Sequence, residues 1–87
     1  MDNHKIYEHI TQFLTFLLSQ TYITENQHAK YDLDKIIEKM IYTPPEMSPY
    51  IILHGNTQKG GLITFLNMYC SDNETIYNEF MKLKSKL

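Results

Sequence analysis

The chain has 87 residues, which is enough for one small domain spanning residues 1–87 and too few for two hydrophobic cores. Its formal net charge is −2 and its eight basic residues are all lysines. Nucleic-acid binders usually carry a basic excess and use arginine on guanines and phosphates, so this composition argues against nucleic acid as a partner. The single cysteine, Cys70, excludes an internal disulfide bond and favours a cytoplasmic location, in the producing cell or, for a viral gene, in its host.

Residues 3–22 have the apolar spacing of a long amphipathic helix. Its apolar arc covers roughly 200°, about twice what an ordinary surface helix needs. Such a helix must be covered on two sides, by the rest of the chain or by a second copy, so a homodimer is one expectation. Phe16 lies at the far side of the arc and has no obvious cover within the chain. The apolar run 13–18 is too short to cross a bilayer, so no membrane partner is expected.

Residues 32–42 form the next predicted helix, after a polar connector at 25–31. Asp32 is a suitable N-cap. Apolar residues recur at helical spacing on one face, and charged residues occupy the opposite, solvated face. The charged residues are Asp34, Lys35, Glu38 and Lys39. The helix should end at Thr43-Pro44-Pro45, because a residue that precedes proline avoids the α region.

Two helix starts are predicted in the segment that follows. Thr43 and Glu46 have the spacing of a capping box, and Ser48-Pro49 offers a second start. Near the end of the chain, Ser71 and Glu74 have the same capping-box spacing and predict a helix over about 73–86.

Residues 50–66 are ambiguous, because short β-branched apolar runs suit buried strands as well as buried helices. A β-hairpin here would give an α+β fold. The runs do not alternate polar with apolar residues, and an isolated hairpin is marginally stable, so helix is favoured. The predicted fold class is therefore all-α, a compact bundle of four to five short helices around a long N-terminal helix.

The glycine-containing segment 55–67 resembles in part the phosphate-binding loop of viral and phage-type helicases, through Gly55, Gly60 and Thr64-Phe65. That resemblance implies nucleotide binding. The loop requires Lys and then Ser or Thr after its last glycine, to reach the phosphates and magnesium, and this chain has Gly61 and Leu62 there. A glycine-rich connector is the preferred interpretation, and no cofactor is expected.

Histidine and cysteine give little support to metal binding or catalysis. No two of the four histidines have the close spacing of a zinc site, so no metal is expected. Cys70 lies just before a predicted helix N-terminus, which would lower its pKa, and it forms a nominal dyad with His54. A lone cysteine beside an aromatic residue is more often buried filler, which is the reading we prefer. We predict that the chain is not an enzyme.

The size of the chain and residues 46–68 resemble the DNA-binding domain of phage repressors, through Tyr50-Ile51, Gly55, Leu62 and Thr64-Phe65. This resemblance implies a helix-turn-helix transcriptional regulator, which is the alternative function. The candidate recognition helix carries Glu46, Met47, Ser48 and Tyr50, and contains no Lys, Arg or Gln for phosphate contacts.

The preferred function is binding to another protein, without catalysis, as a regulator or inhibitor of phage, viral or mobile-element type. Seven tyrosines and five methionines support it, because both types are favoured at interfaces. Lysine without arginine is typical of an AT-biased gene, as in many such small accessory proteins. The predicted interaction surface consists of Tyr7, Phe16, Met47 and Tyr50.

Overall fold

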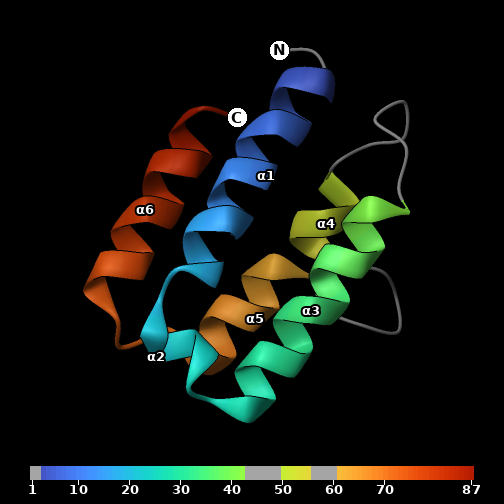
Figure 1. The fold of residues 1–87 in the computed structure, drawn as a ribbon. Helices are drawn as coiled ribbons and strands as arrows, with labels where there is room; N and C mark the ends of the chain where they lie inside the picture. The colour runs from blue at the N-terminus through green and yellow to red at the C-terminus, as the bar shows by residue number, and fades with distance from the viewer. Residues whose placement is uncertain (1–2, 43–49, 56–60) are drawn as a thin grey trace.

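The computed structural model describes residues 3–42, 50–55 and 61–87, and every regular element within these ranges is a helix (Figure 1). The helices are α1 (Asn3–Leu18), α2 (Thr21–Thr24), α3 (Gln27–Ile41), α4 (Tyr50–His54), α5 (Leu62–Tyr69) and α6 (Glu74–Ser85). The predicted all-α bundle around a long N-terminal helix is confirmed. The hairpin alternative is wrong, because both apolar runs of residues 50–66 lie in helices.

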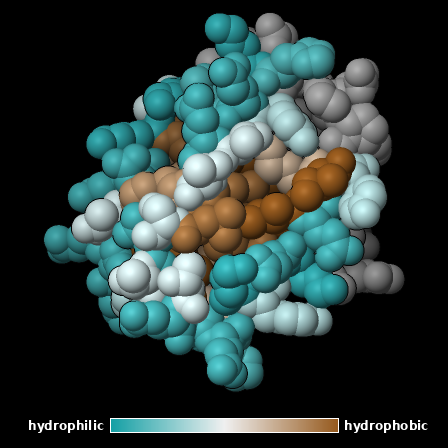
Figure 2. Space-filling view, viewed as in Figure 1, coloured by the Kyte–Doolittle hydropathy of each residue, from teal (hydrophilic) through white to brown (hydrophobic). Residues whose placement is uncertain are grey.

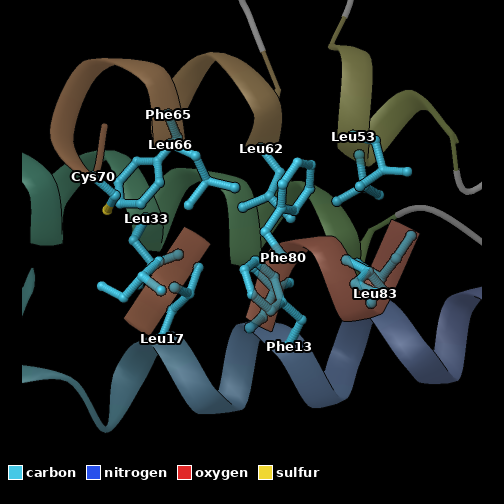
Figure 3. Close-up of a cluster of buried hydrophobic side chains, with 14 of the residues drawn as sticks. Phe13, Leu17, Leu33, Leu53, Leu62, Phe65, Leu66, Cys70, Phe80 and Leu83 are labelled. Atoms are coloured by element: carbon cyan, nitrogen blue, oxygen red, sulfur yellow. The ribbon is translucent and has the colours of Figure 1, made fainter. Parts of the chain in front are cut away.

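The hydrophobic core lies between two groups of helices. On one side α1 and α6 run antiparallel and in contact, and on the other side α3, α4 and α5 contact one another (Figure 1). Figure 3 shows Phe13 and Leu17 of α1 pointing toward Leu62 and Leu66 of α5. Burying one such side chain completely contributes about 1.5–3 kcal/mol, so this shared core holds the short helices in place.

The wide apolar arc of α1 is flanked on both sides by other parts of the same chain. On one flank the Tyr7 hydroxyl donates a hydrogen bond to the Met40 carbonyl oxygen of α3, at 3.1 Å. On the other flank Phe16 is half-buried and stacks on Phe13, with ring centroids 6.1 Å apart. Phe13 in turn contacts Phe80 of α6, at 5.8 Å between centroids. Helices α3 and α6 therefore cover most of the apolar arc of α1 within the same chain.

The first helix is shorter than predicted, because it ends at Leu18 and not near Tyr22. The Ser19 hydroxyl donates to the carbonyl oxygen of Phe16 at 2.6 Å. The backbone N–H groups of Ser19 and Gln20 donate to carbonyl oxygens three residues earlier, as in a tightened last turn. Side chains that bond to nearby backbone in this way compete with continuation of a helix. The separate turn of α2 then buries Ile23 completely.

The caps of α3 and α6 also differ from the prediction. Asn26 caps α3, since its side-chain oxygen accepts from the backbone N–H groups of His28 and Ala29, both at 3.1 Å. The helix thus begins five residues before the predicted Asp32. Asn73, and not Ser71, caps α6 by accepting from the Ile76 N–H at 3.0 Å. Asparagine is among the residues preferred at helix N-caps.

The predicted helix starts within residues 43–49 lie outside the described residues. None of the helices in the described ranges is long and apolar enough to span a membrane.

Candidate functional site

A groove of about 550 Å³ lies between α3 and α5. This volume is within the range of ligand and peptide pockets. Its walls include Tyr31 and Lys35 from α3, Tyr42 at the C-cap of α3, and Thr64, Phe65 and Met68 from α5. Three of these side chains are large, apolar and exposed: Tyr31 by 62%, Tyr42 by 79% and Met68 by 65%. Nothing in the described part of the chain covers them, so the groove presents apolar surface to a second molecule.

The base of the groove is fixed by contacts between buried or half-buried groups. Phe65 is buried, and its ring lies 5.2 Å from that of Tyr69. The Tyr69 hydroxyl donates to the Asp32 carboxylate at 2.5 Å, which links α5 to α3. That hydrogen bond is the main cause that raises the pKa of the Tyr69 phenol above its ordinary value of 10.0, with smaller contributions from burial and from the Asp32 charge. The groove is therefore held in shape before any ligand arrives.

The close approach of α4 and α5 beside the groove depends on Gly61. A Cβ atom at this position would lie 2.5 Å from both the Gly55 nitrogen and the Ile52 oxygen. Real Cβ atoms essentially never come so close to backbone atoms. Gly61 also lines the groove. The glycine that stands where a phosphate-binding loop requires lysine is therefore needed here for helix packing.

The charges around the groove are balanced. It is lined by Lys35 and Lys39 and by Asp32 and Glu38. The Lys35 ammonium lies 3.8 Å from the Glu38 carboxylate and 5.4 Å from the centre of the Tyr31 ring. Phosphate binding needs an excess of positive charge, which this groove does not offer. Aromatic side chains, in contrast, are enriched at protein interfaces.

A second apolar feature is visible in Figure 2, where hydrophobic side chains form a band across the viewed face, with hydrophilic surface on either side. On α3, Ile41 is 69% exposed and follows half-buried Ile37 by one helical turn, so both share a face of that helix. At the end of α1, Leu18 is 40% exposed.

The predicted interaction residues are not gathered in this groove. Tyr7 and Phe16 are half-buried on the two flanks of α1. Met47 lies outside the described residues, and Tyr50 begins α4, where only its backbone is described. The role of these four residues in binding therefore stays a prediction.

The groove residues were missed because they lie in segments predicted to be connector or helix end. The sequence pattern places Tyr31 in a polar connector and Tyr42 at the last residue of a helix, where an isolated tyrosine carries no signal. The sequence feature that could have identified them is their spacing. In a helix that begins at Gln27, residues 31, 35, 38 and 42 lie on one face.

Cys70 is buried at the end of α5, which confirms the interpretation as core filler. Burial raises the pKa of its thiol to about 11, so the expected lowering by a helix N-terminus is wrong. Ser71 and Asp72 separate the thiol from the Asn73 cap, and desolvation of the thiolate dominates.

No three His, Cys, Asp or Glu side chains among the described residues gather as a metal site would require. The candidate recognition helix of the repressor resemblance falls on residues 46–50, of which only Tyr50 is described, as the start of the five-residue α4. The DNA-binding reading therefore stays an untested prediction.

Comparison of the chain with protein-family models, with curated proteins and with solved structures finds no match.

Proposed function

We propose that the chain acts by binding another protein molecule, without catalysis, through the face formed by α3 and α5. The observation that carries the proposal is the groove itself, where Tyr31, Tyr42 and Met68 are each more than 60% exposed around one concave surface. Single exposed apolar residues are ordinary on a protein surface, whereas a cluster of them at a concavity is typical of an interaction site. Tyrosine and methionine are also among the residues enriched at interfaces.

The chemistry of the groove favours protein over small-molecule or nucleic-acid ligands. Its lining offers aromatic and thioether groups, together with lysine and carboxylate side chains in equal number. A protein segment with an apolar anchor and flanking polar groups satisfies both kinds of surface. Within this proposal we favour a regulator or inhibitor of phage, viral or mobile-element type that works in the cytoplasm, supported by the small size and arginine-free composition of the chain.

The test is affinity capture from extracts of the cells that make the chain, with wild type and two matched variants. Met68→Glu places a charge in the groove, and Met81→Glu places the same charge on α6, where the methionine is 43% exposed. We expect a protein that is captured by wild type and by Met81→Glu and is lost with Met68→Glu. Capture that is equal for all three chains, or absent for all three, would overturn the assignment of this face.

A further inference from the structure

The solvent-facing side of α3 carries a regular stripe of four residues, Tyr31, Lys35, Glu38 and Tyr42. Their spacing of four, three and four residues keeps them on one face of the helix and is the spacing of a coiled-coil seam. Tyr42 is the C-cap of the helix, and its backbone N–H still donates to the Glu38 carbonyl oxygen. The two tyrosines are 62% and 79% exposed, and the Lys35 and Glu38 side chains 54% and 60%. The stripe faces solvent, because the opposite side of α3 carries the helix's buried residues. These are Ala29, Leu33 and Met40.

The order of residues in the stripe is symmetric about the midpoint between Ile36 and Ile37. Read from either end, it gives a tyrosine, a pair of opposite charges and a tyrosine. When two such helices pair antiparallel about that midpoint, residues at equal distances from it lie at the same height, since each contributes the same rise of about 1.5 Å. Tyr31 then lies opposite Tyr42 of the second copy, and Lys35 lies opposite Glu38 of the second copy.

We propose that this stripe is a self-complementary surface through which two copies of the chain associate, with their α3 helices antiparallel across a two-fold axis. The inference rests on the proposed function, because it names a second copy of the chain as the protein that binds the face formed by α3 and α5. A two-fold interface uses one patch on both subunits and needs that patch to complement itself. Lys35 and Glu38 meet this condition in the antiparallel arrangement, because Lys35 of each copy lies opposite Glu38 of the other copy.

The same charges disfavour the alternative, parallel orientation. In a parallel pair, Lys35 would lie opposite Lys35 and Glu38 opposite Glu38, and like charges across an interface are repulsive. The net charge of each chain is only −2, so association of two copies meets little overall repulsion.

The groove beside α3 enlarges the surface available to a second copy. With 15 residues, α3 is about 22 Å long, and a stable interface usually buries about 800 Å² on each partner. One helical stripe alone falls short of that area. Met68 of α5, which is 65% exposed across the groove, extends the contact beyond the helix. The resulting interface is modest in area, and interfaces at the low end of the size range are typically weak and transient.

Charge reversal provides the test. Lys35→Glu leaves two glutamates facing each other across the two-fold axis, and Glu38→Lys leaves two lysines. We expect sedimentation equilibrium, from about 1 µM to about 1 mM chain, to show a dimer for wild type and a dissociation constant raised about tenfold or more for each variant. Mixing the two variants should restore the dimer, since every pair is then opposite in charge. The double variant Lys35→Glu with Glu38→Lys should also restore it.

The control uses the equivalent ion pair of α6, where Lys82 lies 3.0 Å from Glu79 with the same three-residue spacing. Lys82→Glu and Glu79→Lys make the same charge changes outside the stripe and should leave the dimer unchanged. Circular dichroism establishes that each variant keeps its helices. A wild type that stays monomeric over the whole range overturns the proposal, as does a dimer that withstands both reversals or a mixture that fails to re-form it.

This result separates the two proposals. A monomeric chain whose capture of another protein still depends on Met68 overturns the self-association and leaves the protein-binding face intact. A monomeric chain with no capture that depends on Met68 overturns both.

Discussion

The hydroxyl of Tyr69 donates a 2.5 Å hydrogen bond to the carboxylate of Asp32, and this bond joins α5 to α3 beside the groove. The two residues are 37 positions apart, so the contact forms only when the bundle is complete. It orients the wall of the groove that carries Met68, the residue that precedes Tyr69. A change to either partner therefore acts on the shape of the proposed binding face as well as on stability.

The first prediction concerns alkaline pH. The folded-state pKa of Tyr69 is raised above 10.0, so the folded protein holds this proton more tightly than the unfolded chain does. The stabilisation is complete below pH 10 and is lost as the pH rises through the folded-state value. We expect Tyr69→Phe to remove a phenol that ionises above pH 10, measured as phenolate absorbance against pH. Tyr77→Phe, on exposed α6 surface, is the control. Titration curves of the same shape for the two variants would contradict the role of the Asp32 bond.

The second prediction concerns Gly61. Gly61→Ala would place a Cβ atom 2.5 Å from backbone atoms of α4 and of Gly55, and backbone yields less easily than a side chain. We expect the free energy of unfolding to fall by about 1–3 kcal/mol, as for other overpacked sites. Urea unfolding followed by circular dichroism measures it. Thr64→Ala, on an exposed position of α5, should change stability by less than about 0.5 kcal/mol. Equal effects of the two substitutions would mean that α4 and α5 do not approach so closely.

The sequence predicts the fold class well and the helix ends poorly. Apolar periodicity identified the all-α class and the core faces, because burial of one helix face is encoded every three to four residues. Helix ends depended on competition between nearby polar residues, in which Asn26 prevailed over Asp32 and Asn73 over Ser71. Spacing alone does not rank such competitors. A predicted helix that begins at Asp32 leaves Tyr31 in a connector, so the sequence alone does not reveal the stripe of α3 or the groove beside it.

The third prediction compares a half-buried aromatic residue of α1 with an exposed one of α6. Phe16 is half-buried against the core and stacks on Phe13, so Phe16→Asp should lower the free energy of unfolding by about 1–3 kcal/mol. Tyr77→Asp, at a 51% exposed position of α6, should change it by about 0.5 kcal/mol or less. Urea midpoints at equal m-values give both numbers. A Phe16 variant that keeps its stability and loses self-association would instead make α1 the interface predicted from its wide apolar arc.

The last prediction concerns the buried thiol. Cys70 is only 2% exposed and its pKa is raised from 9.0 to about 11, because burial penalises the thiolate. At pH 8 the folded chain thus contains about 100-fold less thiolate than the unfolded chain, and the thiolate is the reactive form. We expect a thiol reagent such as dithionitrobenzoate to react at least about 100-fold more slowly with the folded protein than with the protein in urea.

The same shift fixes the sign of a stability effect. A folded-state pKa above the unfolded value contributes stability that is complete below pH 9 and is lost as the pH rises toward 11. Cys70→Ala should therefore flatten the fall in urea midpoint over this range, and combining it with Tyr69→Phe should flatten it further, because both groups hold their protons more tightly in the folded state. Rapid labelling of the folded protein at pH 8 would show that the thiol is open to solvent and would restore Cys70 as a candidate for chemistry.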